Sequence, residues 1–111
     1  IGYQDRDTPE LSKQAAAWET VQKAHAISNG VFVAAVNRVG KEDALTFWGR
    51  SFVCDPFGEV IAQAGENKPE NLIVKCDLSK VEQTRQDWPF LRDRRVDAYQ
   101  KLTRIYDDPH A

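Results

Sequence analysis

The sequence has few cysteines, no long apolar run and almost no net charge, and each shortage excludes a class of protein. Fifteen basic and seventeen acidic residues give a formal net charge of -2 at pH 7, so the chain has no overall field that would recruit nucleic acid or an anionic membrane. No apolar run approaches the roughly 20 residues that span a bilayer, and no signal-peptide pattern is present. We therefore expect a cytoplasmic protein without a membrane or nucleic-acid partner.

Cysteine and histidine are scarce, with two of each. Cys54 and Cys76 both lie in strand-like segments of a chain without export signals, so we expect buried, reduced thiols rather than a disulfide. Neither cysteine stands in a metal-ligand cluster with His25 or His110. The sequence therefore suggests no metal site and no organic cofactor.

The composition that remains is typical of a single folded domain. Of the 111 residues, 41% are hydrophobic and 29% are charged, and there is no internal repeat or low-complexity tract. A chain of this length buries most of the surface that its unfolded form exposes. The order of its expected elements, a helix, a strand, a hairpin, a further strand and a short helix, predicts the α/β class.

A long helix is predicted from about residue 8 to residue 29. Thr8 suits the N-cap and Pro9 the first turn, and Asn29 followed by glycine supplies a left-handed stop. Residues at spacings of three and four form one stripe that faces the core: Leu11, Ala15, Trp18, Val21 or Gln22, and His25. We interpret His25 as a hydrogen-bonded core residue rather than a catalyst, because no Ser or Cys lies at a spacing that would pair with it.

The strands expected after this helix differ in their patterns. Residues 31–36 are apolar almost without alternation, which is typical of a strand covered on both faces. Residues 51–54 and 59–64 form a predicted β-hairpin, because the Asp-Pro-Phe-Gly between them has a proline that presets φ and a glycine that accepts a positive φ. A further strand is expected at residues 72–76.

The remainder of the chain is more polar. Ser79 and Glu82 have the spacing of a capping box at the start of a short helix, and Trp88 followed by proline ends it. Beyond this helix the sequence is polar with widely spaced apolar anchors, so we expect an extended C-terminal tail.

The stretch FVCDPFGEV resembles the surroundings of a catalytic cysteine. A nucleophilic thiol needs a neighbouring base or cation and a donor aimed at the oxyanion that it creates. Four residues precede Cys54 in a suggestive order: Glu10, Lys13, Glu19 and Lys23. They lie on a helix where most should face solvent, with nothing to place them beside the hairpin. Turn geometry explains the Asp-Pro-x-Gly by itself, and we predict that Cys54 is not the nucleophile.

Three stretches carry a resemblance to a known family: WETVQKAHAISNGVFVAAVNRVGKE, FWGRSFVCDPFGEVIAQAG and LIVKCDLSKVEQTRQDWPFLRDRRVDAY. In this order and at these spacings they resemble the C-terminal half of a nitrilase-superfamily carbon-nitrogen hydrolase. Within the superfamily the sequence is most similar to the N-carbamoylputrescine amidase family, through KAHAISNG, NRVGKE, FWGRSF and WPFLRDRRVDAY.

The resemblance implies a four-layer α-β-β-α sandwich, of which residues 1–111 are the C-terminal portion of one hydrolase domain. It also implies a Glu-Lys-Cys triad in the N-terminal half, outside this chain, so none of the residues here is assigned as catalytic and the chain alone is expected to be inactive. The implied reaction converts N-carbamoylputrescine and water to putrescine, carbon dioxide and ammonia in polyamine synthesis. Two alternatives stay open: another amidase of the superfamily, acting on an aliphatic amide or ω-amide, and a truncated, non-catalytic α/β interaction module.

The same resemblance nominates substrate contacts. Ile1 and Gly2 match the end of a Thr-Ala-Ile-Gly segment that follows the nucleophile, and the resemblance implies that the stretch after this segment borders the pocket. Plant and some bacterial relatives have a glutamate two residues past the glycine that could meet the ammonium end of the substrate. That position holds Gln4 here, with Asp5 adjacent. Gly2, Gln4 and Trp48 are therefore the candidate substrate-binding residues, although a solvated loop for the first two and simple packing for Trp48 stay open.

The arginines of the tail suggest a different kind of contact. Arg92, Arg94 and Arg95 are interleaved with Asp93 and Asp97, and no exposed aromatic series accompanies them, which argues against nucleic acid. In the family this tail reaches another subunit, so the resemblance implies intersubunit ion pairs in a homo-oligomer, a dimer or larger. The other expected partner is a small carbamoyl or amide substrate.

Overall fold

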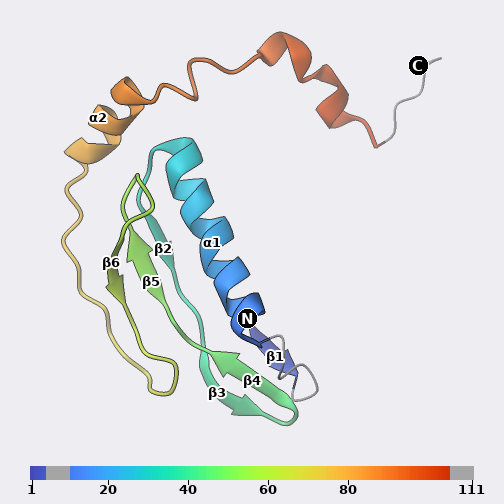
Figure 1. The fold of residues 1–111 in the computed structure, drawn as a ribbon, viewed down its shortest axis with the longest axis vertical. Coiled ribbons are helices and arrows are strands. Elements are labelled where there is room, and N and C mark those ends of the chain that lie inside the picture. Colours follow the sequence, from blue (N-terminus) through green and yellow to red (C-terminus); the bar gives the residue numbers. More distant parts are fainter. Residues whose placement is uncertain (5–10, 106–111) are drawn as a thin grey trace.

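The computed structural model describes residues 1–4 and 11–105, which form an α/β structure with two small antiparallel sheets, as predicted for the fold class (Figure 1). One sheet has the strand order β1-β4-β3 and the other β2-β5-β6. The elements are β1 (Gly2–Gln4), α1 (Leu11–Asn29), β2 (Val33–Ala35), β3 (Val39–Glu42), β4 (Leu45–Trp48), β5 (Phe52–Cys54), β6 (Val60–Gln63), α2 (Ser79–Asp87), and the 3-10 helices η2 (Val96–Ala98) and η3 (Gln100–Thr103).

Helix α1 ends where the sequence predicts. Gly30 has a φ of 59°, and the amides of Gly30 and Val31 donate to the carbonyls of Ile27 and Ala26 at 3.3 and 3.1 Å. These bonds satisfy carbonyls that the helix end would leave without a donor. The predicted cap at Thr8 and Pro9 lies outside the described residues, as does the side chain of Leu11.

The inward face of α1 differs from the prediction at its C-terminal end. His25 is exposed, and Ala26 is fully buried instead. At about 100° per residue, Ala26 lies only about 20° around the helix from the buried Ala15, whereas His25 lies about 80° away. The interpretation of His25 as a core residue is therefore wrong. The prediction left one position of the inward stripe open between Val21 and Gln22, and the structure has Gln22 half-buried and Val21 exposed.

The predicted hairpin is confirmed. β5 and β6 pair antiparallel, with Phe52 opposite Gln63, and the amide of Gly58 donates to the carbonyl of Asp55 at 2.8 Å. The side chain of Asp55 also closes the turn, because its Oδ1 accepts from the amides of Phe57 and Glu59 at 2.9 and 3.0 Å. A carboxylate used in this way is a structural part of the turn.

Two strand predictions need correction. Residues 72–76 are extended and alternate between half-buried and exposed positions, but they form no ladder with a neighbouring strand. β2 is shorter than predicted, and Ala34 and Val36 on its outer face are exposed, Val36 to 90%. The described residues supply a covering layer only on the face toward α1, so the prediction of a strand covered on both faces is not met within them.

The sheet β1-β4-β3 was not predicted at all. β3 and β4 form a hairpin in which Gly40 pairs with Phe47, and Asp43 in the connection has a φ of 52°. The run Leu-Thr-Phe-Trp of β4 has the composition of a strand. The residues before it, Lys-Glu-Asp, are of types that are depleted in strands, and they obscured the pattern of a hairpin.

Helix α2 lies where it was predicted, but its start is different. Asp77 accepts from both the amide and the hydroxyl of Ser79, at 3.0 and 2.7 Å, and no side-chain cap involves Glu82. These two bonds hold the pKa of Asp77 below its ordinary value. The predicted capping box is therefore wrong, because Asp77 accepts from both the amide and the hydroxyl of Ser79.

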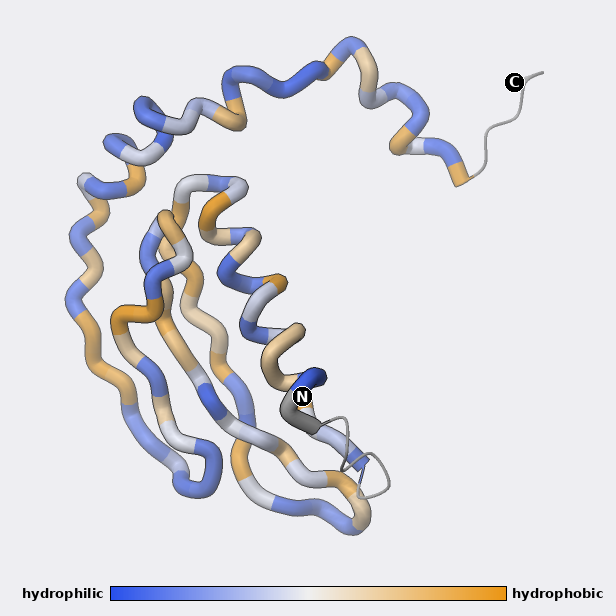
Figure 2. The backbone as a smooth tube through the Cα atoms, viewed as in Figure 1, coloured by the Kyte–Doolittle hydropathy of each residue, from blue (hydrophilic) through white to orange (hydrophobic). Residues whose placement is uncertain are grey.

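The core lies between α1 and the sheet β2-β5-β6. It consists of four buried residues with three half-buried neighbours, namely Ala26, Ala35, Phe52 and Cys54 with Trp18, Val33 and Val60. The ring of Trp18 stands edge-on to Phe52 with centroids 5.7 Å apart. After α2 the chain curves away from the sheets as a mostly hydrophilic tail with isolated hydrophobic positions, as predicted (Figure 2).

Candidate functional site

The three candidate substrate contacts lie in one sheet. Gly2 pairs with Phe47 and Gln4 with Leu45 across β1 and β4, and Trp48 is the last residue of β4. Paired residues share a face of a sheet and successive residues alternate, so Gly2 and Gln4 are on one face and Trp48 is on the other. The structure therefore brings the three into one sheet but does not gather them on one face. Asp5, the alternative to Gln4, lies outside the described residues.

Trp48 packs against helix α1. Only 5% of it is exposed, and its ring centroid lies 6.2 Å from that of Trp18 at an interplanar angle of 68°. Among the described residues its indole Nε1 is buried without a hydrogen-bond partner. This environment is that of a core tryptophan with one unused donor.

Gly2 allows a close approach between two strands. A Cβ placed on Gly2 would collide with the backbone of Thr46 in β4. Gln4, at the other end of β1, is exposed. The lack of a side chain at Gly2 thus has a structural cause that is independent of any substrate.

The family-like motifs meet at a place that we call the strand junction, which consists of Asn37, Arg38, Gly49, Arg50 and Ser51. Here the chain passes from β2 to β3 and again from β4 to β5, so both sheets join at this point. The amide of Asn37 donates to Ser51 Oγ at 2.8 Å, and Ser51 Oγ donates to the carbonyl of Asn37 at 3.1 Å. The amide of Gly49 donates to the carbonyl of Arg38 at 2.9 Å. The Asn-Arg-Val-Gly and Phe-x-Gly-x-Ser motifs are therefore one structural unit.

The side chain of Asn37 binds the start of β1. Its Nδ2 donates to the carbonyl of Ile1 at 3.0 Å. The same Nδ2 donates to the carbonyl of Gly49 at 3.0 Å, and the amide of Arg38 donates to Oδ1 at 2.9 Å. One side chain thus links β1 to both crossings of the strand junction.

Arg38 covers the hairpin of β3 and β4. Its guanidinium carbon lies 4.4 Å from the ring centroid of Phe47, within the range of a cation–π contact. Its Nη1 also forms an ion pair with Glu42 at 2.6 Å, in which both side chains are more than half exposed. This arrangement places a charged side chain over an aromatic ring at the surface.

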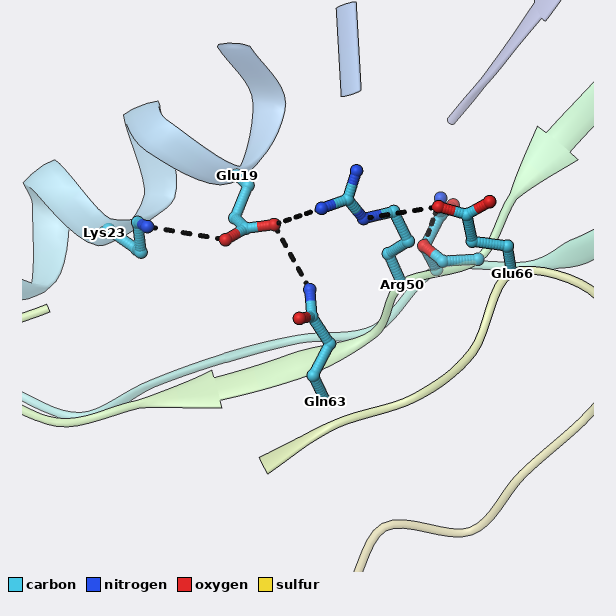
Figure 3. A network of polar contacts seen from close by, with 7 residues as sticks. Glu19, Lys23, Arg50, Gln63 and Glu66 are labelled. Carbon is cyan, nitrogen blue, oxygen red and sulfur yellow. Dashed lines mark hydrogen bonds and ion pairs between the residues drawn. The ribbon is translucent and has the colours of Figure 1, made fainter. Parts of the chain in front are cut away.

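Arg50 joins the strand junction to helix α1 (Figure 3). Its Nη2 lies 3.1 Å from Glu19 Oε2, and the same oxygen accepts from Gln63 Nε2 at 3.2 Å. The other oxygen of Glu19 receives Lys23 Nζ at 3.4 Å. The carboxylate of Glu19, whose side chain is 15% exposed, is therefore held by three donors that come from α1, β6 and the strand junction.

The backbone of Arg50 has an unusual conformation. Its φ is 58°, a value that L-residues other than Asn and Asp seldom adopt, and it follows Gly49 with a φ of 60°. The amide of Arg50 donates to the carbonyl of Gly65 at 3.1 Å. This bond and the ion pair with Glu19 hold a conformation that would otherwise be unfavourable.

One expectation about the surroundings of Cys54 is wrong. Glu19 and Lys23 do lie beside the hairpin, since Glu19 bonds to Gln63 in β6. Cys54, however, is fully buried, and burial raises the pKa of its thiol more than Lys23 lowers it. A neutral thiol without access to solvent has the properties of a core residue and not those of a nucleophile.

Other sites were sought in the part of the chain that the structure describes. Within it, no group of three His, Cys, Asp or Glu residues is arranged to hold a metal ion, and no helix is long and apolar enough to cross a membrane. Both cysteines are free, Cys54 buried and Cys76 half-buried. His110 lies outside the described residues.

Comparison with known proteins decides the family. The model of the carbon-nitrogen hydrolase family matches residues 5–86, which is more than half of the chain. The chain therefore belongs to the carbon-nitrogen hydrolase family. It is 39% identical over 93 residues to the N-carbamoylputrescine amidase of Solanum tuberosum. This match covers 77% of this chain and 31% of that enzyme. It is 36% identical over 91 residues to an omega-amidase of Mus musculus, covering 80% of this chain and 32% of that enzyme.

Solved structures support the same family and the nitrilase-like fold. A carbon-nitrogen hydrolase from Helicobacter pylori matches with a TM-score of 0.91 and 42% identity, over 96% of this chain and 39% of that one. The NitFhit protein of C. elegans matches with a TM-score of 0.67 and 35% identity, over 80% of this chain and 22% of that one. The chain spans about a third of the length of the curated relatives that it matches.

The sequence pointed to the motifs of the strand junction but not to the tasks of their residues. Asn37 and Ser51 were each part of a matching stretch and were not singled out, whereas Glu19 was considered only as a possible neighbour of Cys54. The available signal was the recurrence of small or amide-bearing residues at ends of apolar runs, where chain crossings occur. Which of them would bond to which was not readable from spacing.

Proposed function

We propose that this chain is part of an enzyme that hydrolyses N-carbamoylputrescine to putrescine, carbon dioxide and ammonia. The observation that carries the proposal is the match of 36% to 39% identity to N-carbamoylputrescine amidases of four plants, which reaches 92% of the chain in the relative from Oryza sativa. The omega-amidase of Mus musculus, at 36% identity, is the reason to test the substrate directly. As part of that proposal, the protein is cytoplasmic and takes part in polyamine synthesis.

In this proposal the chemistry is divided between two parts of the enzyme. The Glu-Lys-Cys triad of the family comes from residues outside this chain, where the thiolate attacks the carbamoyl carbon and ammonia leaves. Residues 1–111 form the supporting portion, and β1 borders the substrate through the segment around Gly2 and Gln4. The full burial of the Cys54 thiol is consistent with this division, since a buried thiol is not accessible to a substrate.

The tail completes the proposal as a contact between subunits. Arg92 and Arg95 form ion pairs with Asp93 and Asp97 of the same tail, at 2.9 and 2.5 Å, so these arginines carry no unbalanced charge for nucleic acid. Leu102 and Ile105 are exposed to 78% and 99%. Apolar side chains exposed on the tail favour association with another subunit, and we propose a homo-oligomer, a dimer or larger.

A pair of chimeric enzymes tests the substrate. Residues 1–111 replace the matching segment of the Solanum tuberosum amidase in one chimera and of the Mus musculus omega-amidase in the other. Ammonia release is measured with N-carbamoylputrescine and with an omega-amide, beside each parent enzyme. We expect the first chimera to keep hydrolysis of N-carbamoylputrescine, and the second to gain activity on it relative to its parent.

Two further results bear on the proposal. A first chimera that hydrolyses the omega-amide and leaves N-carbamoylputrescine intact would contradict the substrate and favour an omega-amidase. Residues 1–111 alone should release no ammonia from either substrate. Turnover by the isolated chain, lost on alkylation of Cys54, would refute the division of labour.

A further inference from the structure

The side chain of Asn37 links Ile1 to the strand junction. Its Nδ2 donates to the carbonyl of Ile1 and to the carbonyl of Gly49. One amide thus joins the residue before β1 to the crossing that leads from β4 to β5.

Asn37 is itself held firmly on the opposite side. Its main chain exchanges two hydrogen bonds with Ser51 Oγ, and its side chain also bonds to the amide of Arg38 and the carbonyl of Gly49. Gly49 and Arg50 are in turn fixed by Arg38, Gly65 and Glu19. The amide group cannot rotate without losing several of these bonds, so the position of Ile1 is set by the strand junction.

We propose that Asn37 is a positioning residue for the active site, because it sets where β1 enters and hence where Gly2 and Gln4 stand. The proposal rests on the proposed function for its link to catalysis, since that is what places β1 beside the substrate. Asn37 touches no substrate in this proposal and acts through the main chain of Ile1. Its effect should fall on substrate binding, not on the chemical step.

The substitution Asn37→Asp tests this with the smallest change of shape. It keeps the oxygen that accepts from Arg38, but it replaces the donor with a second oxygen that faces the carbonyls of Ile1 and Gly49. The matched control is Asn71→Asp, the same change of atoms and charge at an exposed position. Asn37→Ser, which removes the bond to the carbonyl of Ile1 without adding a charge, is measured alongside in case Asn37→Asp fails to fold.

The first measurement is amide hydrogen exchange on residues 1–111, which does not depend on any activity. We expect the protection of residues 2–4 to fall about tenfold in Asn37→Asp, as for the loss of one or two hydrogen bonds, with α1 unchanged. Unchanged protection in residues 2–4 would overturn the proposal. Loss of protection throughout the chain in both Asn37→Asp and Asn37→Ser would also overturn it, because Asn37 would then stabilise the whole fold.

The second measurement is kinetic and uses the chimera with the Solanum tuberosum enzyme. We expect KM for N-carbamoylputrescine to rise about tenfold in Asn37→Asp with kcat within about twofold of the parent chimera, and no change in Asn71→Asp. An unchanged KM in a variant whose β1 is released would overturn the positioning role. If the parent chimera is inactive on N-carbamoylputrescine, the proposed function fails while the exchange result still decides whether Asn37 holds β1.

Discussion

Replacing Glu19 and Arg50 by glutamine, singly and together, tests whether burial or distance decides the strength of an Arg–Glu pair in this chain. Two of the Arg–Glu pairs among the described residues are compared, and the longer contact of Arg50 with Glu66 cancels in the double-mutant cycle. Glu19 and Arg50 lie 3.1 Å apart with side chains 15% and 30% exposed, and Arg38 and Glu42 lie 2.6 Å apart with side chains 56% and 60% exposed. The shorter pair is thus the more exposed one.

The expected coupling energies follow from these environments. At an effective dielectric constant of about 20, two charges 3.1 Å apart attract by about 5 kcal/mol before the cost of desolvation is subtracted. Hydrogen bonds to charged groups retain a net stabilisation of about 1.5–3 kcal/mol, and partial exposure reduces this, so we expect a coupling of about 1–2 kcal/mol for Glu19 and Arg50. For Arg38 and Glu42 we expect about 0–0.5 kcal/mol, as for exposed pairs in general.

The assay is a double-mutant cycle for each pair, with urea unfolding followed by tryptophan fluorescence. Trp18 and Trp48 pack against each other beside the pair of Glu19 and Arg50, so unfolding changes their environment. Glutamine at position 50 keeps a side chain at the positive φ, so backbone strain cancels in the cycle. In 1 M salt the coupling of the exposed pair should vanish, while most of the other should persist.

A coupling for Arg38 and Glu42 equal to or larger than that for Glu19 and Arg50 would refute the reasoning. Distance would then outweigh burial, and the network around Glu19 would not be what holds α1 to the strand junction. A coupling near zero for both pairs would equally show that the link between α1 and the junction is apolar.

Three other changes have defined outcomes. Phe52→Ala should lower the free energy of unfolding by about 3–5 kcal/mol in a urea titration, because the ring is 1% exposed at the centre of the core. Asp55→Ala should cost about 1–3 kcal/mol, since the amides of Phe57 and Glu59 lose an acceptor that is itself buried, and the exposed Asp77→Ala should cost less. Burial raises the pKa of the Cys54 thiol, so the unfolded chain loses this proton at a lower pH than the folded one and stability should fall as pH rises above the ordinary thiol pKa. Cys54→Ala should remove that loss of stability at alkaline pH, and the measurement is the pH dependence of the free energy of unfolding.

Each of these outcomes has a result that would contradict it. A loss below about 1 kcal/mol for Phe52→Ala would mean that the small core is not what stabilises the chain. Equal losses for the two aspartates would show that burial of the turn is unimportant. If the free energy of unfolding still falls at alkaline pH in Cys54→Ala, the fall comes from another titrating group and the prediction is wrong.

Local features of the sequence were predictable because they depend on neighbours a few residues away. The end of α1 at Asn29 and the hairpin turn at Asp55 both follow from bonds between residues that are at most five apart. The prediction of His25 as an inward residue failed because an error of one residue on a helix moves a side chain by about 100°. The capping box failed because Asp77, outside the considered spacing, competed for the same amide.

The sequence by itself determined the family, the helices and the hairpin, since these depend on order and on local periodicity. Only the tertiary structure decided that Glu19 meets Arg50, 31 residues away, and that Asn37 holds Ile1, 36 residues away. Periodicity tells which face of an element a side chain is on, but not which other element packs there. Which elements pack together depends on how the two sheets join at the strand junction. The contacts of the candidate site therefore exist only in the folded structure.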